Sequence, residues 1–188
     1  MGSTVFVPEK EFPYASASEN VKSGANILEI STRSKIPFGK SLSTFNLSIL
    51  LKSGKRVKVE CAYQGSKVLE DGTQFENFYW GSPRDAAFDR RIKGKRPVVF
   101  RFFGKEYPTD PVHAFFDFLY IVSLLQRKDD VFEKLNEYDG FSDLYYSYDL
   151  RKEPNTPARA AAKYVSLIRE GLLSKETPSK ELLSLLVG

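Results

Sequence analysis

The feature that most constrains the fold is an apolar run at residues 112–126, which follows Asp110-Pro111. Its apolar side chains fall on almost every face of a helix: Phe115, Phe116, Phe118, Leu119, Ile121, Val122, Leu124 and Leu125. A helix that is apolar nearly all round must be covered on all sides, so this segment is predicted to be the central core helix, capped by Asp110-Pro111. The 188 residues are enough to build one such core and little more.

Shorter patterns predict the elements around this helix. Strands are expected at 27–30 and 98–103, and a hairpin at 44–51 and 56–59 around the turn Lys52-Ser53-Gly54-Lys55. Helices are expected at 60–70, ended by Gly72, and then from Ser82-Pro83, at 130–138, from Thr156-Pro157 to 171, and at 180–187. The pattern predicts the α+β class, with a small antiparallel sheet near the N-terminal side and a helix-rich body.

The first 26 residues have a different composition from the rest. They contain Phe6, Pro8, Phe12, Pro13 and Tyr14, and then a run of small and polar residues. The prolines oppose regular secondary structure, while the aromatic rings favour contact with the body. We expect an extended N-terminal arm at 1–26, packed on a single domain at 27–188.

Scarce residue types exclude several kinds of site. Cys61 is the one cysteine and His113 the one histidine, which excludes an intramolecular disulfide and a zinc site of Cys and His ligands. No apolar stretch approaches ~18 residues and no signal-peptide pattern opens the chain. We therefore expect a cytoplasmic monomer with no metal, cofactor or membrane partner. The net charge of +4 is compatible with a nucleic-acid or phosphate ligand.

A polar stripe marks the expected helix at 60–70. Glu60, Gln64 and Lys67 recur at a spacing that places them on one helix face directly after a strand. A carboxylate near a helix start, followed by an amide and an ammonium group, can act on one bound group, and Glu60 can donate or accept a proton. The alternative is a solvated helix face with a weak ion-pair network.

Several segments together resemble the NADAR (YbiA-like) superfamily. Its Ser-Asn-Phe motif corresponds to Ser43-Thr44-Phe45, and its Glu-x-x-Tyr/Phe-Gln-Ala-x-Lys motif to residues 60–67, Glu-Cys-Ala-Tyr-Gln-Gly-Ser-Lys. Pro37-Phe38-Gly39, Ser82-Pro83-Arg84-Asp85-Ala86-Ala87 and the region 155–172 resemble further family segments. The resemblance covers residues 27–173. Thr44 replaces the usual asparagine, and the family's tryptophan has no counterpart, with Tyr107 the nearest candidate.

This resemblance implies an N-glycosidase that acts on ADP-ribose attached to a nucleobase. In the branch linked to DNA ADP-ribosyltransferase toxins and phage counter-defence, the substrate is guanine in single-stranded DNA that carries ADP-ribose. In the YbiA-like branch it is a riboflavin-pathway intermediate. Breaking the bond between ribose C1 and nitrogen develops oxocarbenium character, which suits a carboxylate at the position of Glu60. Because two family residues are replaced, a non-catalytic module that binds ADP-ribose or modified DNA is the alternative from another class.

The resemblance also implies a lysine that forms a Schiff base with the opened ribose. The motif alignment places Arg33 there, which cannot react in this way, so Lys35 or Lys40 is expected to take its place. Asp117 interrupts the apolar run and is either a structural hydrogen-bond anchor or a site acid with a raised pKa. His113 and Cys61 are expected to be core residues.

The remaining expected site residues bind substrate. The predicted set is Arg33, Lys40, Ser43, Phe45, Tyr63, Gln64, Lys67, Arg84, Tyr107 and Arg159. Because the ligand carries phosphates, the cations of this set are expected to line or rim one cleft, with Lys93 to Arg96 on the side of the DNA. Tyr145, Tyr146 and Tyr148, with Arg151 and Lys152, form a second candidate for stacking a base.

Overall fold

The computed structural model describes residues 4–18, 21–128, 130–143 and 156–188. The candidate tyrosine cluster around Tyr145 to Lys152 lies outside the described residues. The predicted α+β class is confirmed, since helices and several small sheets surround one continuous apolar core. Within the described ranges, no helix combines the length and the apolar character needed to cross a membrane.

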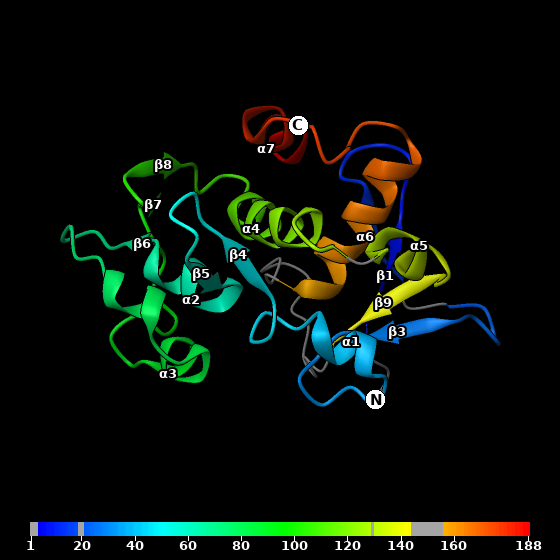
Figure 1. Cartoon of the computed structure of the whole chain (residues 1–188), viewed down its shortest axis with the longest axis horizontal. Helices are drawn as coiled ribbons and strands as arrows, with labels where there is room; N and C mark the ends of the chain where they lie inside the picture. Colours follow the sequence, from blue (N-terminus) through cyan, green and yellow to red (C-terminus); the bar gives the residue numbers. More distant parts are fainter. Residues whose placement is uncertain (1–3, 19–20, 129, 144–155) are drawn as a thin grey trace.

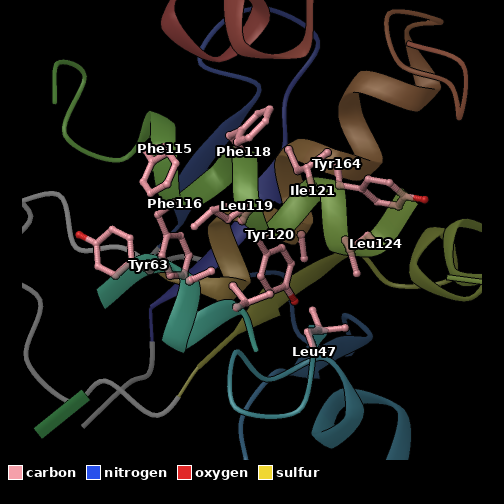
Figure 2. Close-up of a cluster of buried hydrophobic side chains, with 14 of the residues drawn as sticks. Leu47, Tyr63, Phe115, Phe116, Phe118, Leu119, Tyr120, Ile121, Leu124 and Tyr164 are labelled. Atoms are coloured by element: carbon pink, nitrogen blue, oxygen red, sulfur yellow. The ribbon is translucent and has the colours of Figure 1, made fainter. Parts of the chain in front are cut away.

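The predicted central helix is α4 (Ala114–Leu125), which lies in the middle of the molecule in Figure 1. It contacts α2, α6, α7 and β4. Figure 2 shows its side chains pointing outward in several directions into this core, among them Phe116, Leu119 and Leu124. The predicted cap is wrong: the helix begins at Ala114, with His113 at the N-cap position, because a turn from Pro111 O to Ala114 N precedes it.

The N-terminal segment, expected as an arm without regular structure, forms two strands of a sheet. β1 (Val5–Pro8) pairs with β2 (Ala15–Ser18) and, on its other edge, with β9 (Gly140–Ser142). The strand predicted at 27–30 is β3 (Ile27–Glu29), which runs parallel to β9 and completes the order β2-β1-β9-β3. Pro8 is tolerated because only Val5 and Phe6 of β1 pair with β9, so the strand is an edge at Pro8. The ladder therefore joins the segment to a strand more than a hundred residues away in sequence.

The other strands form two smaller sheets, where one small sheet was expected. The predicted hairpin is confirmed as β4 (Ser48–Leu50) and β5 (Arg56–Lys58), although β4 is shorter than expected. The third sheet has the order β6-β7-β8, formed by β6 (Lys67–Val68), β7 (Val99–Phe102) and β8 (Lys105–Tyr107). Sequence patterns predicted β7 and missed its short partners.

The predicted helix at 60–70 is wrong in its length. α2 (Val59–Gly65) ends five residues earlier than expected, because Lys67 and Val68 pair with β7 and the Arg101 N–H donates to Ser66 O. Gly65 is required here, since a Cβ would lie 2.7 Å from the ring of Tyr79. Lys67 is therefore on a strand, two residues beyond the end of the helix, and not on a helical stripe.

The remaining helices are α1 (Pro37–Ser41), the 3-10 helix η1 (Glu76–Trp80), α3 (Pro83–Phe88), α5 (Val131–Asn136), α6 (Pro157–Arg169) and α7 (Ser179–Val187). Of these, α3, α5, α6 and α7 were predicted from the sequence, whereas α1 and η1 were not. Both predicted Ser/Thr-Pro starts are confirmed: the Ser82 hydroxyl accepts from Asp85 N–H, and the Thr156 hydroxyl from Arg159 N–H. α1 packs closely on β3, because Gly39 has no Cβ and approaches Glu29 O.

A buried ionic cluster joins α4 to α6. Asp117 is fully buried and lies 3.2 Å from Arg159 Nη2 and 2.9 Å from Lys163 Nζ. Burial alone would raise the pKa of Asp117, but the charges of Arg159 and Lys163 outweigh it and hold this pKa below its ordinary value. The structure therefore contradicts a site acid with a raised pKa and supports the expected structural anchor.

We expect Asp117→Asn to lower the free energy of unfolding by about 3–5 kcal/mol, because it leaves two buried cations without their counter-charge. Lys163→Met is the matched control, since Asp117 keeps Arg159 and the loss should be smaller. Urea denaturation of the three proteins measures both effects. An Asp117→Asn protein with unchanged stability would show that the cluster does not hold the helices together.

Candidate functional site

A pocket lies where the ends of several elements meet beside α4. Its volume is about 310 Å³, at the lower end of the range for small-molecule sites. Its walls come from segments far apart in sequence: Ile30, Ser31 and Thr32 after β3, Ser43, Thr44 and Phe45 after α1, Glu60 of α2, Phe88 of α3, Phe116 of α4, Asp143 after β9, and Pro157 of α6. Three of the predicted site residues, Glu60, Ser43 and Phe45, line this pocket.

Glu60 is held at the pocket wall by two side-chain hydrogen bonds. Its Oε2 accepts from Thr44 Oγ1 at 3.0 Å, and its Oε1 accepts from Gln64 Nε2 at 2.8 Å. The backbone adds a third link, because Glu60 N–H donates to Thr44 O at 3.1 Å. Both carboxylate oxygens therefore have fixed positions before any ligand binds. Thr44, which departs from the family's asparagine, supplies a donor to the carboxylate.

The environment of Glu60 favours its protonated form. Burial raises the pKa of Glu60, although the hydrogen bonds from Gln64 and Thr44 and the charge of Lys67 each oppose this rise. A carboxyl group with a raised pKa can hold a proton closer to neutral pH and donate it to a leaving group. The local arrangement therefore suits general-acid chemistry.

Lys67 and Tyr63 lie behind Glu60, away from the pocket lining. Lys67 Nζ is 4.8 Å from the centre of the Tyr63 ring, and that ring packs edge-on against Phe116, a pocket wall. Burial lowers the pKa of Lys67 to about 8, and the negative charge of Glu60 opposes this shift. Gln64 therefore contacts the Glu60 carboxyl group directly, whereas Lys67 lowers the pKa of Glu60 through its positive charge.

The structure adds pocket residues that the sequence analysis missed. Asp143 follows β9 and is a buried second carboxylate in the lining. Phe88, at the end of the Ser82-Pro83 helix, is 59% exposed and adds an aromatic face. A carboxylate directly after a short strand and an aromatic residue at a helix end are weak sequence signals, because only the tertiary fold brings them together.

Ser43 has an unusual position in this lining. Its side chain is buried, and within the described part of the chain its hydroxyl has no hydrogen-bond partner. A buried polar group without a partner is destabilising, so a ligand that offered one would be favoured at this point. The predicted binding role of Ser43 is consistent with this geometry.

The structure does not bring the predicted cations together on the pocket walls. Arg33, Lys35, Lys40 and Arg84 have exposed side chains and are absent from the lining. Arg159 is buried against Asp117 and is not among the described residues that line the pocket. Lys93, from the basic loop, lies over the Phe88 ring at 5.5 Å, so that loop does approach the pocket mouth. Cations stay in water unless they are paired, which explains their scatter.

Two further residues considered in the sequence analysis, Tyr107 and Cys61, lie in the core and not in the pocket lining. Tyr107, the nearest candidate for the family's tryptophan, is buried in the core, where its ring centre lies 4.8 Å from Phe115 and 5.2 Å from Phe118. Cys61 is fully buried and burial raises the pKa of its thiol to about 11, so it is a core residue as expected. Among the residues described, no cluster of three His, Cys, Asp or Glu side chains is arranged to hold a metal ion.

We expect the stability of the protein to report on the pKa of Lys67. Between pH 8 and the ordinary value of 10.5, the unfolded chain keeps a proton on this amine that the folded chain has lost, so the free energy of unfolding rises with pH. Lys67→Met removes this contribution. Urea denaturation at pH 7, 8 and 9 should show wild type gaining about 1 kcal/mol per pH unit on the variant above pH 8. Parallel pH dependence of the two proteins would contradict the lowered pKa.

Comparison with known proteins gives one family. The family model described as DarT1-associated NADAR antitoxin matches residues 14–187. The comparison with curated proteins found no match. The family match covers nearly the whole chain, including the pocket residues and the motif around Glu60, and it confirms the resemblance to the NADAR superfamily in its toxin-linked branch. The chain therefore belongs to the family of DarT1-associated NADAR antitoxins.

Proposed function

We propose that this protein is an N-glycosidase that removes ADP-ribose from guanine in single-stranded DNA. It would thereby reverse the modification made by a DNA ADP-ribosyltransferase toxin. The observation that carries the proposal is the Glu60 carboxyl group, which lines a pocket, is fixed by two hydrogen bonds and has a raised pKa. The family's association with the DarT1 toxin supports the choice of substrate.

In the proposed reaction, the bond between ribose C1 and the exocyclic nitrogen of guanine breaks. Glu60 donates its proton to the leaving nitrogen, while the amine of Lys35 forms a Schiff base with C1 of the opened ribose and so displaces guanine. Water then hydrolyses this Schiff base, so the products are unmodified guanine and free ADP-ribose, and the Lys35 amine is regenerated. Asp143, the second carboxylate of the lining, stabilises the positive charge that develops on the sugar. The proposal thus gives the acid role to Glu60 and the electrostatic role to Asp143.

The other lining residues hold the substrate in this proposal. The Ser43 hydroxyl gains a hydrogen-bond partner from the ligand. Phe45 and Phe88 offer aromatic faces at the lining, and a nucleobase stacks on such faces. Thr44 replaces the family's asparagine but still donates to Glu60, so this departure leaves the carboxyl group positioned. This retained contact favours an enzyme over a non-catalytic binding module.

We expect Glu60→Gln to lower turnover by roughly 10² or more while the binding of ADP-ribose stays measurable, because the variant keeps the shape and loses the proton. Release of ADP-ribose from an oligonucleotide modified on guanine measures turnover, and thermal unfolding checks the fold. Wild-type turnover in Glu60→Gln would remove the main catalytic assignment. Binding of ADP-ribose by wild type without any release would favour the binding module.

A matched pair at Thr44 tests how the pKa of Glu60 is set. Thr44→Val removes a hydrogen bond that lowers this pKa, so the pKa should rise and activity should persist to higher pH. Thr44→Asn restores the family residue and a donor, so its pH profile should stay near that of wild type. The pH dependence of kcat for the three proteins provides the measurement, and identical profiles for Thr44→Val and wild type would contradict the role of this bond.

We assign the amine implied by the resemblance to Lys35. Residues 30–32 line the pocket, and Lys35 follows on the same loop with an exposed side chain. Borohydride should trap a covalent adduct of wild type with the modified oligonucleotide, and Lys35→Met should lose the adduct, as read by mass spectrometry. Lys40→Met, on α1, is the control that should keep it. An adduct that survives Lys35→Met would move the assignment to another lysine.

A further inference from the structure

A second distinctive surface lies outside the pocket, where two hairpin tips meet the end of η1. The tips are the turn at residues 52–55, between β4 and β5, and Phe103-Gly104, between β7 and β8. Trp80, the last residue of η1, contacts both of them. Lys55 Nζ lies 5.1 Å from the centre of the Trp80 ring system, and the Phe103 ring lies 6.0 Å from it. We call Trp80, Phe103 and Lys55 the hairpin-tip platform.

The platform exposes large aromatic rings that the core could have covered. Trp80 is 53% exposed and Phe103 is 47% exposed, although the chain is rich in buried aromatic residues. The neighbouring Tyr79 is buried and stacks on Phe103, with ring centres 4.6 Å apart. The exposed rings are therefore supported from below by the core and are held in place, with part of their surface open to solvent.

The backbone holds Phe103 in this position at an energetic cost. Its φ angle is 46°, in the left-handed region that bulky residues rarely adopt, and Gly104 follows with φ 79°. Such a conformation persists only where the surroundings enforce it, and it is frequent at binding sites. Glycine would adopt this conformation without strain, whereas Phe103 adds a ring that packs on Tyr79 and Phe102.

The charges around the platform are mainly positive. Lys52, Lys55, Arg56 and Lys105 on the two hairpins have exposed side chains. Arg101 is neutralised by Glu106, at 2.8 Å, and Glu76 of η1 is an exposed acidic residue on the other side. The balance favours an anionic partner, and a partner with flat rings can also use the faces of Trp80 and Phe103.

We propose that the hairpin-tip platform binds single-stranded DNA through base stacking on Trp80 and Phe103 and phosphate contacts with the surrounding lysines. Unpaired bases expose faces that stack on aromatic side chains, and neighbouring cations hold the phosphates, whereas paired bases in a duplex cannot stack in this way. Along the chain, α3 begins three residues after Trp80, and its last residue, Phe88, lines the pocket. The platform thus adds to the proposed glycosidase a strand-binding surface that acts on nucleotides beside the modified one.

The chain provides its own probe for this proposal, because Trp80 is its one tryptophan. Titration with an unmodified oligothymidylate should quench the tryptophan fluorescence, and the quenching should weaken as salt rises. Unmodified DNA contains no ADP-ribose, so the measurement does not depend on the glycosidase activity. Glu60→Gln should show the same quenching as wild type, which separates failure of this proposal from failure of the proposed function.

Variants then test which residues bind the strand, by fluorescence anisotropy of a labelled oligothymidylate. Trp80→Ala should weaken binding roughly 5-fold or more, and Trp80→Phe should restore part of the affinity. Lys55→Met should also weaken binding. Lys22→Met is the matched control, because this exposed lysine precedes β3, at the opposite end of the molecule from β7 and β8 in Figure 1. Thermal unfolding checks that each variant is folded.

Two results would overturn the proposal. One is an equal affinity of wild type and folded Trp80→Ala for oligothymidylate. If this variant instead lost binding to the toxin protein, the platform would be a protein-binding surface. The other is equal affinity of wild type for the single strand and for a duplex of the same length, since stacking on the platform requires unpaired bases.

Discussion

The structure depends on the ionic contact between Asp117 of α4 and the two cations of α6. An apolar helix tolerates a carboxylate in its first turn only where other charges compensate it, and Arg159 and Lys163 supply them without access to water. The contact fixes α6 across α4, and α6 in turn packs on β1 and β9. The same two helices carry Pro157 and Phe116, so the contact also sets two walls of the pocket.

The pocket is built from the ends of elements, and the core holds those ends in place. Tyr120 of α4 donates to Leu42 O at 2.9 Å and so anchors the chain just before Ser43 and Thr44. The backbone bond from Glu60 N–H to Thr44 O then ties that loop to the start of α2. The position of the Glu60 carboxyl group is therefore a consequence of core packing, and the loop needs little regular structure of its own.

The pocket and the hairpin-tip platform differ in how far their charged groups are exposed to water. Inside the pocket, burial removes water from Glu60 and raises its pKa. At the hairpin tips, lysines keep their hydration and surround exposed aromatic rings. The buried carboxyl group of the pocket and the exposed lysines of the hairpin tips therefore lie in different environments.

Local patterns in the sequence were enough to predict the central helix, the capped starts at Ser82 and Thr156 and the β4–β5 hairpin, and a short motif singled out Glu60 as the candidate acid. The motifs of the sequence also identified the family to which the chain belongs. The end of α2, the partners of Asp117, and the meeting of Glu60 with Asp143 and Phe88 were decided by the tertiary structure. Strand pairing with β7 ended the helix, and the pocket joins residues that no local period relates. Contacts between distant segments depend on how the whole core packs. The pattern of one segment shows which of its residues are apolar or polar, but not which distant residues they will contact.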